Sequence, residues 1–151
     1  MGAVVQADSE DEWLRCYRKM NTDYRIDLIG LSILSIPHCF GGSITDSRIK
    51  LLKILKDERS PKKAHLLGLG DSMKDVLFAQ ENCPFVVSND SSCAFQSGLF
   101  EKQLSEDLEV PGGKVKEKVD FDLKEITLEQ EKLIQSNIDI IRKKIKQYVP
   151  N

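Results

Sequence analysis

The chain has 151 residues, of which 40% are hydrophobic and 30% charged, and its formal net charge is −2. This composition is typical of one globular domain, and the charge excludes a protein held on nucleic acid by bulk charge alone. No apolar run approaches the roughly 20 residues that span a bilayer, and residues 1–13 lack the pattern of a signal peptide. We therefore expect a cytoplasmic protein with no membrane contact.

The cysteines and histidines do not form a metal-binding pattern. The four cysteines include no C-x-x-C pair, and the two histidines, His38 and His65, are not spaced from them as zinc ligands are. We expect four reduced thiols, no metal site and no cofactor.

The first part of the chain alternates apolar runs with helical patterns. Residues 3–6 predict a short strand, and Ser9 begins a helix with Glu12 as its capping-box partner. Residues 26–31 predict a second strand. Residues 32–43, which contain a proline and a glycine pair, predict a loop.

The same alternation continues to about residue 95. A second helix begins near Thr45, residues 64–69 predict a third strand, residues 73–81 a third helix and residues 85–88 a fourth strand. The strands are nearly continuous apolar runs, which is typical of parallel strands buried on both faces. The order β-α-β-α-β-α-β predicts an α/β fold with right-handed crossovers.

The C-terminal part has a different character. Residues 101–126 are charged, carry Pro-Gly-Gly in the middle and predict a linker after a β/α domain of residues 1–100. Thr127 then begins a long helix over 127–151, with Gln130 as its capping-box partner. Apolar residues recur along it at helical spacing, which favours packing on the sheet. Its basic end leaves contact with a partner or a nucleic acid open.

Functional groups of parallel α/β folds collect at the carboxyl ends of the strands. Asp90 follows the fourth strand and is the best candidate for a nucleophile, because small hydroxyl residues that could orient it flank it. Gly68 and Gly70 follow the third strand, where glycines let a flat ligand approach the backbone. The alternative interpretation is that turns are simply rich in these residue types.

Four segments in this order resemble a known family. They are GAVVQ at residues 2–6, IGLS at 29–32, HLLGLG at 65–70, and Asp90 at the end of the next strand. Their order and spacing are similar to the second half of tRNA-guanine transglycosylases over roughly residues 2–100. The zinc-binding subdomain of the tRNA enzymes has no counterpart here, so the chain is closest in character to the DNA-modifying or virus-encoded relatives.

The resemblance implies a TIM barrel that exchanges a guanine in tRNA or DNA for a 7-deazaguanine. It implies that Gln6 hydrogen-bonds the base edge and that Gly30, Gly68 and Gly70 line a flat base pocket. It further implies that Asp90 is the nucleophile that takes the ribose C1′ as a covalent intermediate. Ala7 stands where the family has a glycine, and Ser91 and Ser92 stand where it has Pro-Thr.

The chain has material for half of such a barrel, because a complete (β/α)₈ barrel takes about 250 residues. We therefore expect four parallel strands with helices, plus the long C-terminal helix. The front half, which in the family supplies a second catalytic aspartate, is missing. A homodimer, a separately encoded front half or the C-terminal helix could cover the open side of the sheet.

Three functions compete. The first is one half of a base-exchange enzyme for guanine or 7-deazaguanine that needs a partner chain. The second is a non-catalytic half barrel derived from that family, which binds a protein or a nucleic acid. The third is an unrelated α/β domain.

Overall fold

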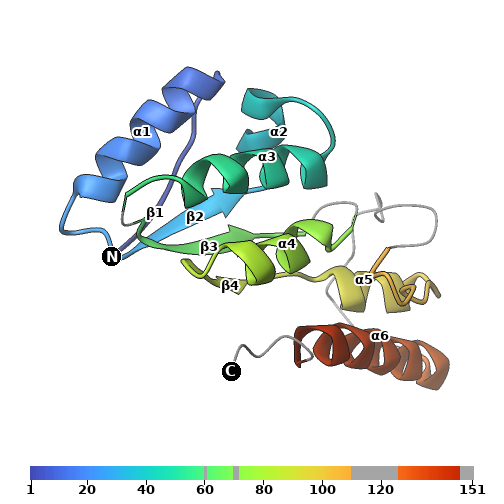
Figure 1. The fold of residues 1–151 in the computed structure, drawn as a ribbon. Helices are drawn as coiled ribbons and strands as arrows, with labels where there is room; N and C mark the ends of the chain where they lie inside the picture. Colours follow the sequence, from blue (N-terminus) through green and yellow to red (C-terminus); the bar gives the residue numbers. More distant parts are fainter. Residues whose placement is uncertain (60, 70–71, 110–125, 147–151) are drawn as a thin grey trace.

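The computed structural model describes residues 1–59, 61–69, 72–109 and 126–146, and the structural statements below concern these residues. At its centre lies a parallel four-stranded sheet whose spatial order, β1-β2-β3-β4, follows the chain order. Its strands are β1 (Gly2–Val4), β2 (Leu28–Ser32), β3 (Lys63–Leu67) and β4 (Val86–Asn89). The helices are α1 (Glu10–Thr22), α2 (Ser35–Phe40), α3 (Ile44–Lys56), α4 (Lys74–Asn82), α5 (Cys93–Leu99) and α6 (Leu128–Lys146) (Figure 1).

Local capping explains where the long helices begin. The Ser9 hydroxyl accepts a hydrogen bond from the Glu12 N–H at the start of α1. At the start of α6, the Gln130 N–H donates to the Thr127 hydroxyl and the Thr127 N–H donates to the Gln130 side chain. Both predicted helix starts are thus confirmed, and α6 has the complete reciprocal box.

The prediction of a loop over residues 32–43 is wrong, because this segment contains the helix α2. Pro37 is the third residue of α2, in its first turn, where the missing N–H of proline has no helical partner to lose. Ile36 and Phe40, one helical turn apart, are buried, and the Phe40 ring packs edge-on against Trp13. Burial of Ile36 and Phe40 therefore stabilises a short helix, which the proline and glycines of this segment argued against at the level of sequence.

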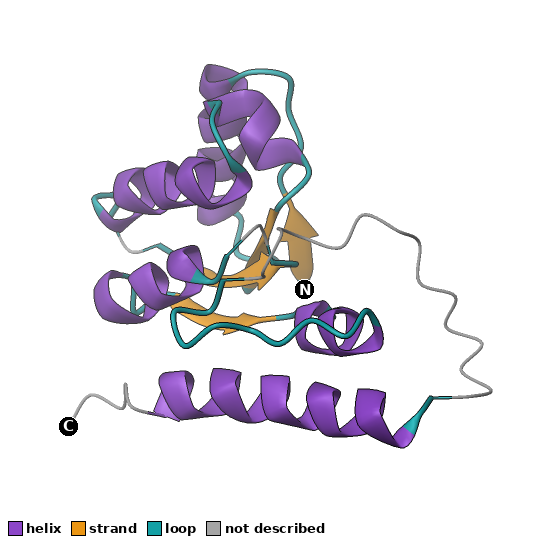
Figure 2. Ribbon diagram, turned by 90° about the vertical axis from the view of Figure 1, so that its right-hand side faces the viewer, coloured by secondary structure: helices purple, strands orange, loops and turns teal. Residues whose placement is uncertain are grey.

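The helices surround one side of the sheet, as expected for half of a TIM barrel. In Figure 2 they form an arc around the strands, with α6 at its lower end. The side chains facing this arc form the core: Ile29, Leu31, Ala64 and Leu66 are all at most 1% exposed. The predicted α/β half barrel with a long C-terminal helix is confirmed. Because successive strands are parallel neighbours and their crossovers have the same hand, the connecting helices lie on one face of the sheet.

The other face of the sheet, called here the open face, is not covered by the described residues. On this face Val4 of β1 is 42% exposed and Leu67 of β3 is half-buried, and both lie over Gly30. The prediction that the strands are buried on both faces is therefore wrong for the described part of the chain. Val4, Leu28 and Leu67 share this face with Lys63 and His65, so the uncovered surface is apolar only in part.

Helix α6 packs against α5 and the edge of β4, on the side of α4, rather than over the open face. A cavity of about 170 Å³ between β4, α4 and α6 is lined by Ala79, Val86 and Ile145 among others. The side chain of Asn137 is fully buried and donates to the carbonyls of Ala94 and Lys102, while its oxygen accepts from the Leu104 N–H. A polar residue thus anchors α6 by satisfying backbone groups in the first turn of α5 and in the segment that follows α5.

Residues 101–109, the first part of the predicted linker, pack on the molecule. Leu104 and Leu108 are buried, and Ser72 forms an antiparallel bridge with Glu109. The remainder of the predicted linker, residues 110–125, lies outside the described residues. No helix in the described ranges is both long and apolar enough to cross a membrane.

Candidate functional site

Asp90 lies directly after β4, at the carboxyl end of the sheet, where sequence reasoning placed the nucleophile. Its side chain is 62% exposed. The Gly68 N–H donates to its Oδ1 over 2.7 Å, and its own backbone N–H donates to the carbonyl of Leu66 over 3.2 Å. The carboxylate is therefore accessible to a ligand and is still anchored to the neighbouring strand.

His65 of β3 lies beside the same carboxylate. Its Nε2 is 3.3 Å from Asp90 Oδ1, and its Nδ1 is 2.8 Å from the hydroxyl of Ser88. Since β3 and β4 are parallel neighbours with His65 opposite Ser88, the sheet itself places the imidazole between these two partners. The contacts of both His65 and Gly68 are to Oδ1, so Oδ2 has no hydrogen-bond partner among the described residues.

The environment favours the ionised form of Asp90. The Gly68 N–H, followed by the His65 hydrogen bond, holds the pKa of Asp90 below its ordinary value, although partial burial acts in the opposite direction. A carboxylate needs to be deprotonated to act as a nucleophile. Asp90 therefore presents an anionic oxygen at neutral pH, and this charge is exposed to solvent.

Gly68 adopts a left-handed backbone conformation with φ of +74°, which L side chains rarely adopt. A Cβ at this position would also come within 2.9 Å of Ile33 Cδ1. Glycine is required here because the turn after β3 must direct the Gly68 N–H toward Asp90.

Arg48 and Asp75 lie beneath this turn and are both fully buried. Arg48 Nη1 donates to Asp75 Oδ2 over 2.7 Å and to the Gly68 carbonyl over 2.9 Å. Its Nη2 donates to the carbonyls of Leu67, over 2.8 Å, and Leu31, over 3.3 Å. The guanidinium thus satisfies carbonyls at the carboxyl ends of both β2 and β3.

Burial and pairing act on this ion pair in opposite directions. Burial lowers the pKa of Arg48 and raises the pKa of Asp75, and the charge of each partner opposes the shift of the other. The short contact and the three carbonyls bound by Nη1 and Nη2 favour the charged pair, because hydrogen bonds lower the cost of burying a charge. Arg48 Nε is buried and has no hydrogen-bond partner among the described residues.

The remaining predicted residues are less closely associated with Asp90. Gln6 follows β1 and is exposed, with no hydrogen-bond partner among the described residues. Gly30 lies in β2 beneath Val4 and Leu67, and a Cβ there would come within 2.7 Å of Leu67 Cδ1. Gly70 lies outside the described residues. The structure therefore brings Gly68 to Asp90, whereas Leu67 covers Gly30.

Sequence reasoning missed His65 as a partner of Asp90, and it missed Arg48 and Asp75. The sequence places His65 in the HLLGLG segment and excludes it as a zinc ligand, but assigns it no role beside Asp90. Arg48 had a readable signal, because it precedes Leu51, Leu52 and Leu55 by three, four and seven residues and so shares their buried helical face.

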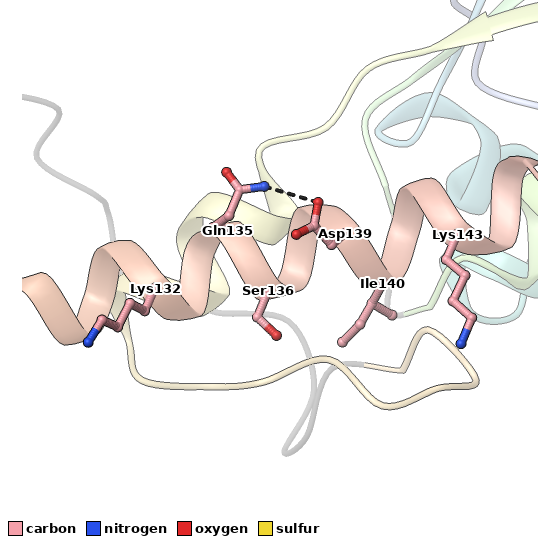
Figure 3. Close-up of a pocket in the computed structure, with 6 residues that line it drawn as sticks. All are labelled: Lys132, Gln135, Ser136, Asp139, Ile140 and Lys143. Carbon is pink, nitrogen blue, oxygen red and sulfur yellow. Dashed lines mark hydrogen bonds between the residues drawn. The ribbon is translucent and has the colours of Figure 1, made fainter.

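A separate groove lies on α6, away from these residues. It has a volume of about 490 Å³ and is lined by Lys132, Gln135, Ser136, Asp139, Ile140 and Lys143 (Figure 3). The Gln135 amide donates to Asp139 over 3.0 Å, so part of its polar lining is already paired. The described part of the chain contains no group of three or more His, Cys, Asp or Glu side chains placed to hold a metal ion.

Fold and site together define a parallel α/β half barrel with an anchored, exposed carboxylate at the carboxyl end of its last strand. Comparison of the chain with protein-family models, curated proteins and solved structures finds no match.

Proposed function

We propose that this chain is the nucleophile-bearing half of a transglycosylase that exchanges guanine for a 7-deazaguanine in tRNA or DNA. The observation that carries the proposal is the Asp90 carboxylate, which is exposed, ionised and held by the Gly68 N–H at the carboxyl end of β4. One carboxylate oxygen is anchored and the other has no described partner, which suits an attacking group.

The reaction takes two steps. An oxygen of Asp90 forms a bond to the ribose C1′, the glycosidic bond breaks and the guanine leaves with the bonding electrons. The ring nitrogen of the incoming base then attacks C1′, and the ester bond to Asp90 breaks to restore the carboxylate. An acid outside this half protonates the departing guanine, and the incoming base loses one proton, so the exchange is balanced.

A partner chain belongs to this proposal. The open face carries Val4 and Leu67, which the described residues leave exposed and half-buried, respectively. An uncovered apolar face of this kind is a common mark of an interaction surface. The partner is either a second copy of this chain or a separately encoded front half, and it would supply the rest of the base pocket, to which Gln6 and Gly70 also belong.

The test is incorporation of labelled guanine into tRNA and into DNA, each with the chain alone and with a candidate front half. We expect Asp90→Asn and Asp90→Ala to reduce incorporation at least about 1,000-fold, since the covalent step is lost. Asp11→Asn, at an exposed aspartate of α1, is the matched control and should retain full incorporation. Incorporation by the Asp90 variants at the wild-type rate would refute the proposal.

The second candidate is a non-catalytic half barrel that binds a protein through the open face. The exposure of Val4 favours it, because catalysis does not require an exposed apolar residue there. Under this alternative, Asp90→Ala leaves binding intact and Val4→Asp abolishes it. Under the first proposal, Asp90→Ala abolishes incorporation even when the partner still binds.

A further inference from the structure

The peptide group between Leu67 and Gly68 connects two charged side chains. Its carbonyl oxygen accepts from Arg48 Nη2 over 2.8 Å, and its N–H donates to Asp90 Oδ1 over 2.7 Å. Because a trans peptide is planar and its C=O and N–H point in opposite directions, the cation and the carboxylate lie on opposite sides of one rigid unit.

Arg48 also restrains the next peptide group. Its Nη1 donates to the Gly68 carbonyl over 2.9 Å, so the guanidinium binds the carbonyls on both sides of the Gly68 Cα. Asp75 fixes the guanidinium from below over 2.7 Å, and the Leu31 carbonyl binds it from β2. A planar guanidinium makes several such bonds in fixed directions, which an ammonium group cannot reproduce.

We infer that Arg48 is a positioning residue of the Asp90 site: it holds the Leu67–Gly68 peptide so that the Gly68 N–H points at the Asp90 carboxylate. A cation on the carbonyl of an amide also polarises its N–H, which strengthens the bond that the N–H donates. The inference deepens the proposed function and rests on it only for the chemical role of Asp90.

Two basic side chains act on Asp90 among the described residues. His65 of β3 contacts it directly, and Arg48 of α3 acts through the peptide and by its charge. Removing Arg48 alone would leave the Asp75 carboxylate buried without a cationic partner, so the informative variant is Arg48→Met/Asp75→Leu, which removes both charges together. Arg48→Lys is the second variant, since it keeps a cation beside Asp75 but loses the planar fork.

The experiment is an NMR titration of the unliganded chain, following the side-chain carboxyl carbon of Asp90 and the amide of Gly68. In the wild type we expect the Gly68 amide shift to follow the ionisation of Asp90 with the same midpoint. In Arg48→Met/Asp75→Leu the midpoint should rise toward the ordinary aspartate value of about 3.9, and the amide response should shrink. Arg48→Lys should give an intermediate result.

Leu55→Ala is the matched control, because it removes buried packing from the same face of α3, two turns from Arg48. It should destabilise the fold and leave the Asp90 midpoint and the Gly68 response unchanged. The inference is wrong if either Arg48 variant is folded and keeps both wild-type values.

This titration involves no nucleic acid, so the two proposals can fail separately. If Asp90 responds to Arg48 but base incorporation never occurs, the positioning role stands and the transglycosylase proposal fails. If incorporation requires Asp90 but the titration midpoint of Asp90 is unchanged in the Arg48 variants, the transglycosylase proposal stands and the positioning role fails.

Discussion

At the scale of single residues, Asp90 and Asp75 show how environment separates two carboxylates. Asp90 is 62% exposed and is stabilised in its ionised form by a backbone N–H, whereas Asp75 is fully buried and relies on Arg48. Sequence position predicted Asp90, because it follows a strand. Nothing local distinguishes Asp75, because its role depends on a partner 27 residues away.

The first residue-scale prediction concerns the buried ion pair. Asp75→Leu should lower the free energy of unfolding by about 3–5 kcal/mol, since it leaves the Arg48 charge buried and uncompensated. Arg48→Met/Asp75→Leu should recover most of that loss. Urea unfolding of the purified variants measures both effects, with Asp11→Leu at an exposed site as the control. A single variant as stable as the wild type would show that the pair is not charged.

The second residue-scale prediction concerns Tyr17, whose buried hydroxyl has no hydrogen-bond partner in the described part of the chain. Burial, followed by the charge of Glu58, raises the pKa of Tyr17 from 10.0 to about 12. The unfolded chain therefore loses this proton at a lower pH than the folded chain, and stability falls as the pH rises from 10 toward 12.

Tyr17→Phe should remove this part of the alkaline loss of stability and change stability near pH 7 by less than about 1 kcal/mol. Urea unfolding at neutral pH and near pH 11 tests this. Tyr24→Phe is the matched control, because Tyr24 is 89% exposed and should keep the wild-type pH dependence. An unaltered alkaline decline in Tyr17→Phe would contradict the assignment.

At the scale of elements, α6 is the clearest case of a helix whose existence was readable and whose docking was not. Its capping box at Thr127 and Gln130 is a local signal, and it was predicted. Its most deeply buried described residue is the polar Asn137, which no apolar pattern identifies. The close approach to α5 depends on Gly98, where a Cβ would come within 2.7 Å of the Ile134 backbone nitrogen.

Gly98→Ala should therefore displace α6 and cost about 1–3 kcal/mol, because the contact is with backbone that cannot rotate away. Hydrogen exchange along residues 128–146 should accelerate selectively. Gly2→Ala is the control, since a Cβ there meets only the Leu28 carbonyl at 3.8 Å. If hydrogen exchange along residues 128–146 in Gly98→Ala is as slow as in the wild type, α5 and α6 can accommodate the added Cβ at no cost.

At the scale of the whole molecule, the helical layer covers one face of the sheet and the described residues leave the other face open. Of the three covers that the sequence left open, the C-terminal helix does not provide one within the described residues, because α6 packs against α5 beside β4. Edge strands and an uncovered apolar face favour association. The open face is thus the surface on which the proposed partner chain would act.

Light scattering on the purified chain tests whether the chain associates through the open face. We expect a mass above that of a 17.1 kDa monomer, and a shift toward the monomer in Val4→Asp, which places a charge on the open face. Leu34→Asp, at an 83% exposed residue after β2, is the control and should keep the wild-type mass. A monomeric wild type would rule out the homodimer and leave a separately encoded front half as the partner.

The sequence by itself determined the parallel α/β arrangement, the four strands, the long helices and the position of Asp90 after the last strand. These features follow from capping residues, hydrophobic periodicity and turn chemistry, which act over a few residues. Only the tertiary structure decided which group anchors Asp90, that Arg48 lies beneath Gly68, and which face of the sheet stays open. These depend on contacts between residues such as Gly68 and Asp90, 22 positions apart, whose pairing the sheet register sets.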